Sequence, residues 1–344
     1  MKRLGNLWSR ITAIENLEKA FRLAAREKRW QKKVRKVEER LGERLLELQR
    51  TLESGAYRTS SYKTKVIYEP KKRTIYILPF YPDRILHHAV MNVLEPWWDG
   101  MMIHDSYACR AGKGQHAGSR RCMEWARRYR YVLKCDVSKF YPSVDHAVLK
   151  SIVRRKLKDP KLLALLDEII DSSNSCPGAV QGKNVPIGNY LSQWFGNLYL
   201  NELDTFVKQE LKVKPYERYC DDFLLFSDDK AQLREWADRI EEFLGERLKL
   251  ALSKREVFPV TQGIDFLGYR HFPDYILVRK STALRVKRRV ASIRRQIARG
   301  TVKWKTAQGQ VASAMGWLGH ANSKHLSDSL RLPELKAEID GHTA

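Results

Sequence analysis

Three aspartates in this chain have the type and setting needed to hold divalent cations. Asp221 and Asp222 are adjacent, between Tyr219-Cys220 and the apolar run from Phe223 to Phe226. Aromatic and aliphatic residues on both sides of an Asp-Asp pair favour a β-hairpin with the acids at its turn. Asp136 follows a separate apolar run and is expected at the end of a buried strand. Carboxylates placed in this way can bind two Mg²⁺ ions, which activate an attacking hydroxyl and stabilise the leaving oxygen in phosphoryl transfer.

An isolated Asp-Asp pair is more often a solvated turn than a cation site. Asp228-Asp229 fits that interpretation, because it precedes the amphipathic run from Lys230 to Leu244, where an acid caps a helix. The pair at 221 and 222 differs, because a third acid, Asp136, occurs in matching surroundings elsewhere in the chain. We therefore interpret these three acids as one phosphoryl-transfer site.

The segments around the acids predict an α+β fold built on an antiparallel sheet. Tyr131 to Cys135 is predicted as a buried strand, and the hairpin around Asp221 supplies two more strands. Apolar residues at helical spacing predict one helix from Val34 to Leu52 and another from Ile85 to about Trp97. These helices must cover the sheet that carries the acids.

A second hairpin is predicted nearer the N-terminus. Lys65 to Tyr68 and Thr74 to Leu78 have strand-like composition, and Pro70-Lys71-Lys72 between them supplies the turn. The segment from Asn174 to Asn184 contains proline and two glycines and is predicted as a loop.

Taken in order, these motifs resemble those of reverse transcriptases. The first acid is followed five positions later by an aromatic residue, Tyr141, and the acid pair lies in a Tyr-x-Asp-Asp hairpin. The further matching segments are Lys71 to Pro79 with Asp83-Arg84, Val185 to Gln193 running into Trp194 to Asp204, Leu248 to Phe258, and Phe266 to Tyr269. The resemblance covers about residues 60–320 in family order.

This resemblance implies an α+β right-hand polymerase fold with fingers, an antiparallel-sheet palm and a helical thumb. Residues 1–60 would form an N-terminal basic helical segment and residues 61–130 the fingers. Residues 131–275 would form the palm, with fingers helices interleaved, and residues 276–344 a basic helical thumb.

The resemblance also implies an RNA-directed DNA polymerase that uses two Mg²⁺ ions, with Mn²⁺ as a substitute. Asp136 and Asp221 would bridge both ions, and the Val137 carbonyl would be a further ligand. Asp222 would contribute more weakly. The partners would be template RNA, the RNA/cDNA heteroduplex and deoxynucleoside triphosphates.

The residues expected at the incoming nucleotide are Arg73, Tyr141, Ile187, Gly188, Gln193 and Lys254. Tyr141 would exclude a 2′-hydroxyl, Arg73 would grip the triphosphate with its fork of donors, and Lys254 would donate a proton to the pyrophosphate. Each of these three has a structural alternative: a buried aromatic for Tyr141, an exposed strand residue for Arg73 and a surface lysine for Lys254.

The segment from Val185 to Gln193, which we call the middle motif, indicates which subfamily of reverse transcriptases the chain resembles. Many relatives have Pro-Gln-Gly and then Ser-Pro, whereas this chain has Pro186-Ile187-Gly188 and then Ser192-Gln193. This pattern, with Gly316 to Ala321, is similar to the reverse transcriptases of diversity-generating retroelements. That subfamily implies errors opposite template adenines and a small basic helical oligomeric accessory protein as partner.

Several alternatives stay open. Another prokaryotic reverse transcriptase, of the abortive-infection or intron type, is the nearest. A non-catalytic RNA-binding or splicing-helper protein on the same fold is a second. An RNA-dependent RNA polymerase is disfavoured, because those enzymes usually have a second acid where this chain has Tyr141. Because only a short segment follows His320, we expect neither an endonuclease extension nor an RNase H domain.

Charge agrees with a nucleic-acid partner. The chain has 64 Lys and Arg against 40 Asp and Glu, a net charge of +24, and a polyanion would neutralise that field. The excess gathers in residues 1–36 and 270–300, the second on a run with helical spacing. The residues expected to bind nucleic acid are Arg84, Arg285, Lys287, Arg288, Arg289, Arg294 and Arg295. The alternative for this run is a solvated helix face.

The sequence has no apolar stretch of membrane-spanning length and no leader-like apolar core at its N-terminus. The five cysteines show no Cys-x-x-Cys spacing and are expected to be reduced, without a zinc site. We therefore expect a cytoplasmic protein of a prokaryote or a phage.

Overall fold

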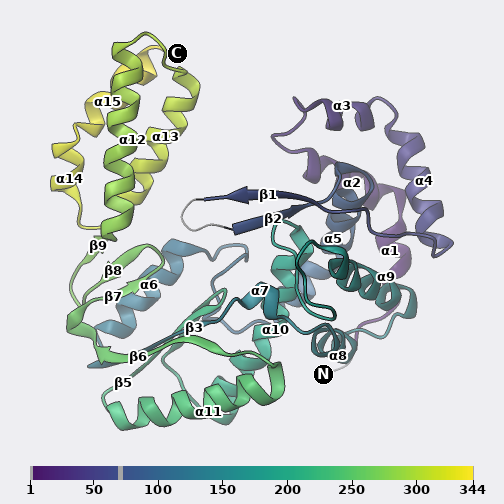
Figure 1. Cartoon of the computed structure of the whole chain (residues 1–344), viewed down its shortest axis with the longest axis horizontal. Coiled ribbons are helices and arrows are strands. Elements are labelled where there is room, and N and C mark those ends of the chain that lie inside the picture. Colours follow the sequence, from purple (N-terminus) through teal and green to yellow (C-terminus); the bar gives the residue numbers. More distant parts are fainter. Residues whose placement is uncertain (1–2, 69–72, 344) are drawn as a thin grey trace.

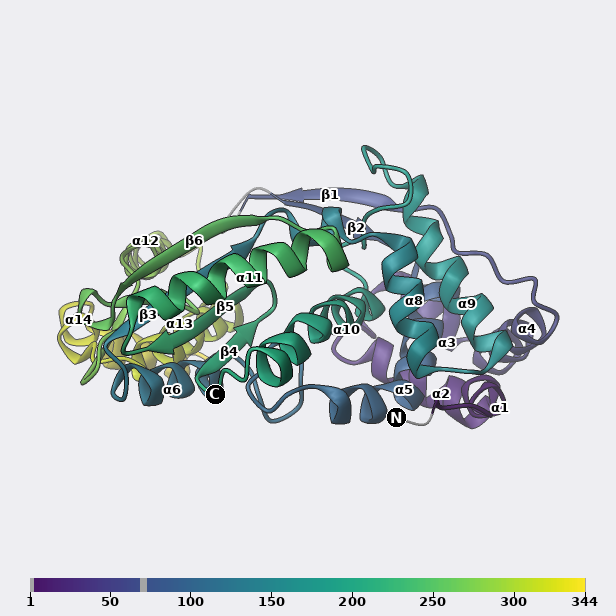
Figure 2. The ribbon, with the colours of Figure 1, turned by 90° about the horizontal axis from the view of Figure 1, so that it is seen from below.

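The computed structural model describes residues 3–68 and 73–343. The N-terminal helices lie at one end of the molecule and a C-terminal helical bundle lies at the other, with a β-sheet between them (Figures 1 and 2). We call this central sheet the palm sheet. Its strands are β3 (Tyr131–Val137), β4 (Tyr216–Tyr219), β5 (Asp222–Ser227) and β6 (Leu252–Pro259). They are ordered β4-β5-β3-β6, and every pairing is antiparallel.

The palm sheet forms because its strands alternate between two buried faces. Leu133, Phe223 and Leu225 belong to the main core with the helices α10 (Tyr190–Thr205) and α11 (Lys230–Leu248). Leu224 and Phe226 point the other way, into a second core with α6 (Gln115–Ala126). All five side chains are fully buried, and burial of each such side chain contributes about 2 kcal/mol. Because both of its faces are covered, the palm sheet is a rigid support for the side chains at its ends.

The N-terminal part is helical, with one departure from expectation. The predicted single helix over Val34 to Leu52 is wrong, because the chain breaks near Arg40, which has φ −129° and ψ 39°. The helices before the palm sheet are α1 (Trp8–Thr12), α2 (Ile14–Ala25), α3 (Lys32–Glu38), α4 (Leu41–Glu53) and α5 (Ile85–Met101).

A two-stranded hairpin extends from this helical part over the palm (Figure 2). Its strands, β1 (Lys63–Ile67) and β2 (Arg73–Ile77), are antiparallel, as predicted. The turn predicted at Pro70-Lys71-Lys72 lies outside the described residues. We call β1 and β2 the fingers hairpin. The helices α7 (Phe140–Ser143), α8 (His146–Lys156) and α9 (Pro160–Asp171) then lie between β3 and the middle motif.

Asp229 is the N-cap of α11, and its side chain accepts a hydrogen bond of 2.7 Å from the Ala231 amide. This confirms the predicted helix cap at Asp229, whereas Asp228 Oδ1 accepts a hydrogen bond of 2.9 Å from the Arg130 amide.

The C-terminal part has a core of its own. A small sheet of β7 (Ile264–Phe266), β8 (Tyr269–His271) and β9 (Ile276–Val278) leads into a helical bundle, which we call the thumb bundle (Figure 1). Its helices are α12 (Lys280–Ala298), α13 (Trp304–Gly319), α14 (Lys324–Ser329) and α15 (Leu332–Gly341). The bundle's buried residues, such as Val290 and Leu335, form a cluster separate from the two palm cores.

The predicted α+β class with an antiparallel sheet is therefore confirmed. Within the described residues, no helix is both long enough and apolar enough to cross a membrane.

Candidate active site

The three predicted acids lie at one end of the palm sheet. β3 and β5 pair so that Asp136 is directly opposite Asp222. The Val137 amide donates a hydrogen bond of 3.2 Å to the Asp221 carbonyl. The two-residue loop Cys220-Asp221 joins β4 to β5, and Cys220 has φ 53°, as tight hairpins require. Sheet register thus brings together acids that are far apart in the sequence.

A buried ion pair anchors this hairpin to α10. The Arg218 guanidinium donates to both carboxylate oxygens of Asp204, over 2.8 Å from Nε and 2.6 Å from Nη2. Both side chains are fully buried. Arg218 Nη1 also donates to the Cys220 carbonyl over 2.9 Å, so the pair holds the loop that carries Asp221. Neither residue was predicted as part of the site, because their pairing depends on how α10 packs under β4.

Burial and neighbouring charges shift the pKa values of the acids. Burial raises the pKa of Asp221, and the Asp136 carboxylate raises it further, whereas the Arg73 charge lowers it. Burial also raises the pKa of Asp222 to about 6, against the opposing effect of Lys134. Lys134 Nζ lies 3.3 Å from Asp222 Oδ2, and this lysine is a third residue whose role was not predicted from the sequence. Its only signal was a lysine two positions before Asp136 in an otherwise apolar strand.

The donor set suits a hard divalent cation in its chemistry. All the donors are oxygens, and Asp222 Oδ1 is buried with no hydrogen-bond partner among the described residues. Asp136 Oδ2 accepts a hydrogen bond of 3.0 Å from the Ser253 hydroxyl. Nevertheless, residues 3–68 and 73–343 contain no group of three or more His, Cys, Asp or Glu side chains gathered closely enough to hold a metal.

Tyr141 lies beside the acid hairpin. Burial raises its pKa, and the neighbouring Cys220 and Asp221 raise it as well. A Cβ placed on Gly196 of α10 would lie 3.4 Å from the Tyr141 ring, so the small residue leaves room for the aromatic side chain. The Tyr141 ring is half-buried, and its neighbour Phe140 is almost fully buried in the main core.

The fingers hairpin meets the middle motif directly. The Tyr76 amide donates a hydrogen bond of 2.8 Å to the Ile187 carbonyl. Gly188 has φ +117°, and a Cβ there would lie 2.7 Å from the Ile75 side chain and 2.8 Å from the Tyr76 carbonyl. Glycine is therefore required at this crossing. The Ile187 side chain is half-buried.

The remaining predicted nucleotide residues are spread around the acids. Arg73 is exposed at the start of β2, within electrostatic range of Asp221. Lys254 is opposite Asp136 in the β3–β6 pairing, and its ammonium lies 2.9 Å from Glu256. Gln193 is exposed on α10, and its side chain makes no hydrogen bond with another described residue.

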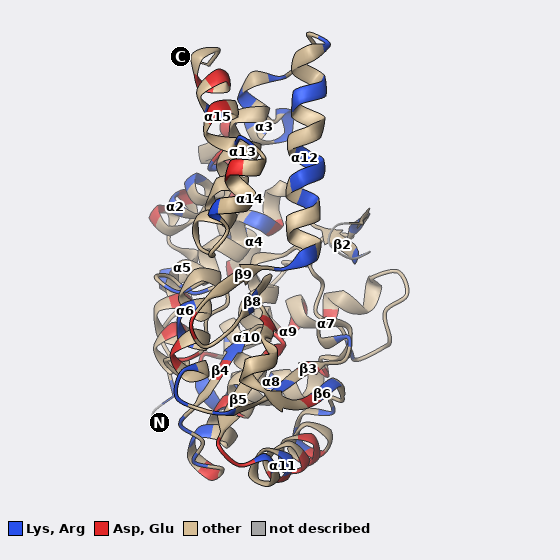
Figure 3. Cartoon of the chain, turned by 90° about the vertical axis from the view of Figure 1, so that its left-hand side faces the viewer, with Lys and Arg blue, Asp and Glu red and all other residues tan. Residues whose placement is uncertain are grey.

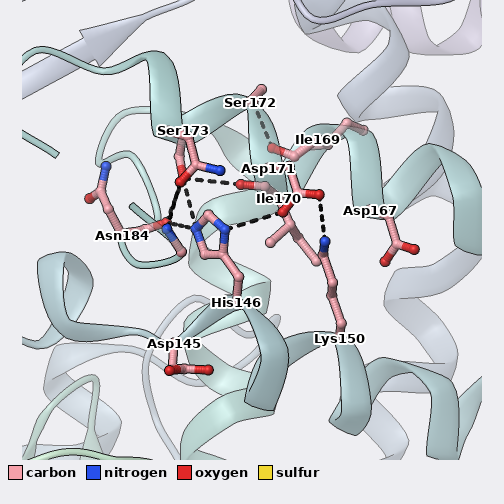
Figure 4. Close-up of polar contacts among 12 residues, drawn as sticks. Asp145, His146, Lys150, Asp167, Ile169, Ile170, Asp171, Ser172, Ser173 and Asn184 are labelled. Carbon is pink, nitrogen blue, oxygen red and sulfur yellow. Dashed lines mark hydrogen bonds and ion pairs between the residues drawn. The ribbon is translucent and has the colours of Figure 1, made fainter. Parts of the chain in front are cut away.

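A polar cluster fixes the loop that precedes the middle motif, and its members His146, Ser173 and Asn184 are buried (Figure 4). His146 contacts Asp171 through Nδ1 over 3.2 Å and the Asn184 carbonyl through Nε2 over 3.0 Å. The Ser173 hydroxyl lies 3.0 Å from His146 Nε2 and donates to the Asn184 carbonyl over 2.8 Å. This Ser-His-Asp order is that of a hydrolase triad, but Ser173 is 0% exposed. The cluster therefore serves to hold the end of the loop against α8 and α9.

The predicted nucleic-acid residues fall into two places. Lys and Arg run along α12 of the thumb bundle (Figure 3). Lys287, Arg288 and Arg295 are exposed, whereas Arg294 is tied to the Leu330 carbonyl over 2.7 Å. The half-exposed residues of the predicted set on α12 are Arg285 and Arg289.

Arg84 lies elsewhere, in the N-terminal part. Burial is the largest cause of the lowered pKa of Lys33. The positive charge of Arg84 is the next largest cause, followed by the charges of Lys28 and Lys63. Arg84 is thus part of a separate group of cations and is not a hydrogen-bond or ion-pair partner of the acids among the described residues.

Residues 62–271, more than half of the chain, match the family described as reverse transcriptase (RNA-dependent DNA polymerase). Protein YkfC of Escherichia coli strain K12 is 28% identical over 265 residues, which cover 64% of this chain and 68% of YkfC.

Relatives connected with introns are also similar. The group II intron-encoded protein LtrA of Lactococcus lactis subsp. cremoris is 24% identical over 176 residues, which cover 50% of this chain and only 29% of LtrA. The mitochondrial nuclear intron maturase 1 of Arabidopsis thaliana is 27% identical over 96 residues, 28% of this chain and 14% of the maturase. Among solved structures, an apo telomerase of Candida tropicalis truncated from the C-terminal domain aligns with a TM-score of 0.46 and 12% identity, over 66% of this chain and 58% of that one.

Proposed function

Because the chain belongs to the reverse transcriptase family, we propose that it copies a template RNA into cDNA, with deoxynucleoside triphosphates as substrates. The observation that carries this proposal is the gathering of Asp136, Asp221 and Asp222 at one end of the palm sheet. A protein that used this fold only to bind RNA would have no need for three mutually repelling carboxylates in one place.

The divalent cations of the reaction would be held by Asp136, Asp221 and the Val137 carbonyl. Asp222 would add the oxygen that Lys134 leaves free. When bound, Mg²⁺ ions at this place neutralise phosphate charge and activate the primer 3′-hydroxyl. Arg218 and Asp204 keep the Asp221 loop in position during turnover, because they are buried and bonded to it.

Other side chains of this chain would orient the nucleotide. Arg73 on the fingers hairpin would contact the triphosphate, since it already lies close enough to Asp221 to lower its pKa. The Tyr141 ring would lie under the sugar and leave no space for a 2′-hydroxyl. Lys254, opposite Asp136, would donate a proton to the leaving pyrophosphate.

We also propose the error-prone subtype, in which template adenines are miscopied for mutagenic retrohoming. The motif around Ile187 supports it, because an apolar branched side chain stands where many relatives have a hydrogen-bonding Gln. Apolar contacts discriminate between base pairs less sharply than directed hydrogen bonds do. An accessory RNA-binding protein as partner depends on this subtype alone.

The subtype can be tested with Ile187→Gln. We expect fewer errors opposite template adenine, with errors opposite the other bases less affected, in cDNA sequenced from one adenine-rich RNA. Ile187→Val is the matched control, because it changes size and adds no hydrogen-bonding group. Equal adenine error frequencies in wild type and Ile187→Gln would remove the support for this subtype.

A second candidate is an RNA-binding or splicing-helper protein without catalysis. The similarity to a protein named an intron maturase favours it.

Primer extension on an RNA template distinguishes the two candidates. We expect Asp221→Asn to abolish cDNA synthesis while RNA affinity stays within about two-fold of wild type, because the substitution removes a cation ligand and no basic surface. Asp274→Asn is the matched control, since Asp274 is exposed and far along the chain from the acids. Wild-type protein that binds RNA and makes no cDNA with Mg²⁺ or Mn²⁺ would favour the second candidate.

A further inference from the structure

Among the described residues, the thumb bundle shares no buried apolar core with the rest of the molecule. Its buried cluster contains Val290, Ile293, Val311 and Leu335 and no residue of either palm core. Figure 1 shows the bundle reached from the palm through β7, β8 and β9, with α6 beside these strands. The angle between thumb and palm must therefore be set by the contacts at this junction.

Side chains from three elements meet there. α6 supplies His116 and Ser119, β8 supplies Tyr269 and His271, and His320 is the C-cap residue of α13. Ser119, Tyr269 and His271 are fully buried, and His320 is half-buried.

Each hydrogen bond in this group has a defined direction. His271 Nδ1 lies 3.2 Å from the Ile264 carbonyl, which can only accept, so Nδ1 carries the hydrogen and Nε2 is an acceptor. The Ser119 hydroxyl therefore donates to His271 Nε2 over 2.7 Å. Its oxygen then accepts from His320 Nε2 over 2.8 Å. Burial lowers the pKa of both His271 and His320 to about 4, so neutral rings agree with this pattern at neutral pH.

A second chain of bonds runs beside the first. The Tyr269 hydroxyl donates to the Trp317 carbonyl over 3.2 Å and accepts from His116 Nε2 over 3.1 Å. The His116 and His320 rings stack, with centroids 4.1 Å apart and planes 5° apart. Gly268 allows the Trp317 ring to approach, because a Cβ there would lie 2.7 Å from that ring. Palm and thumb are thus joined by a serine between two histidines and by a tyrosine next to the stack.

We propose that Ser119, His271, His320 and His116 form a latch that fixes the angle of the thumb bundle to the palm and so sets how long a bound duplex is retained between nucleotide additions. The nature of that duplex rests on the proposed function. The latch residues are positioning residues, since none of them is a hydrogen-bond or ion-pair partner of the three acids among the described residues.

Loss of the latch should loosen the thumb without changing the reaction itself. We expect Ser119→Ala and His320→Ala each to speed dissociation of an RNA/DNA duplex about three- to ten-fold, the range that one lost hydrogen bond of ordinary strength gives. The cDNA made in a single binding event, in the presence of a heparin trap, should shorten accordingly. The rate of one deoxynucleotide addition to a preformed complex should stay near wild type.

Control variants and a double-mutant cycle test whether the effects come from the latch itself. His325→Ala and Ser313→Ala remove exposed residues of the same types from the thumb bundle and should leave dissociation unchanged. The double variant Ser119→Ala/His320→Ala should dissociate more slowly than the product of the two single effects predicts, because both single variants remove the Ser119–His320 hydrogen bond. Additive effects, or dissociation rates and cDNA lengths equal to those of the controls, would overturn the proposal.

A measurement without nucleic acid keeps this inference separate from the proposed function. Spin labels on Lys305→Cys in α13 and Glu246→Cys in α11, both exposed positions, report the distance between thumb and palm. The background is Cys109→Ser/Cys220→Ser. We expect a narrow distance distribution that broadens with His320→Ala and stays narrow with His325→Ala. An equally narrow distance distribution in His320→Ala and His325→Ala would rule out the latch, even if the protein is a polymerase. If no cDNA is made at all, the broadening would still support it.

Discussion

At the acid end of the palm sheet, single side chains decide which groups carry charge. The three acids and their grouping were predicted from the sequence, because a strand end and a hairpin tip are both visible in residue types. Lys134 was not, since its ion pair with Asp222 exists only once β3 and β5 are in register. Whether Asp222 contacts a cation directly thus depends on a residue outside the recognised motifs.

Discrimination between ribonucleotides and deoxyribonucleotides is assigned to a single residue, Tyr141. We expect Tyr141→Ala to raise ribonucleotide incorporation relative to deoxyribonucleotide by about ten-fold or more, because the half-buried ring would no longer fill the space of a 2′-hydroxyl. The ratio of kcat/KM values for the two nucleotides on one primer–template measures this. Tyr141→Phe keeps the ring and should keep the wild-type ratio. An unchanged ratio in Tyr141→Ala would assign the ring to packing.

At the scale of elements, the β4–β5 hairpin is positioned by α10 as much as by its own sheet. The Arg218–Asp204 pair crosses between them with no exposure to solvent. Removing one partner of such a pair leaves the other charge buried and alone, which costs more than the pair contributes.

We therefore expect Arg218→Met to lower the free energy of unfolding by about 3–5 kcal/mol. The double variant Arg218→Met/Asp204→Leu should recover part of this loss, because no buried charge remains unpaired. Urea denaturation of the three proteins gives the comparison. A double variant less stable than Arg218→Met would show that the ion pair itself, and not the stranded charge, determines stability.

Local sequence patterns predicted most of the elements that surround the site. The buried run at Tyr131, the capping acid Asp229 and the loop before the middle motif were all found in this way. The break near Arg40 was not, because the apolar spacing on both sides of it continues as one helix would. The group of His116, His271 and His320 could not be predicted either, since these residues are brought together only by the placement of the thumb bundle.

At the scale of the whole molecule, charge is distributed unevenly. α12 displays Lys and Arg along its length, whereas α11 carries both signs (Figure 3). The side chains of Lys287, Arg288 and Arg295 are exposed and make no hydrogen bond or ion pair with other described residues. Such unpaired cations on a thumb helix are suited to phosphate contacts.

Neutralising these three residues together to Gln should weaken heteroduplex binding and flatten its dependence on salt. Each lost phosphate contact lowers the slope of log affinity against log salt by about 0.7–0.9. The matched control neutralises Lys230, Arg234 and Arg247 on α11, which changes the net charge equally. The same slope in both variants would mean that α12 contributes only to the general field of the protein.

The most direct measurement replaces one acid by a softer ligand. Asp221→Cys should add a single deoxynucleotide at least about 100-fold more slowly than wild type with Mg²⁺, because a thiolate is a poor ligand for this hard ion. Addition should partly recover with Mn²⁺ or Cd²⁺, which accept sulfur. Asp274→Cys should behave as wild type with each metal. Nucleotide addition by Asp221→Cys at the wild-type rate with Mg²⁺ would contradict the assignment of this end of the palm sheet as the polymerase site.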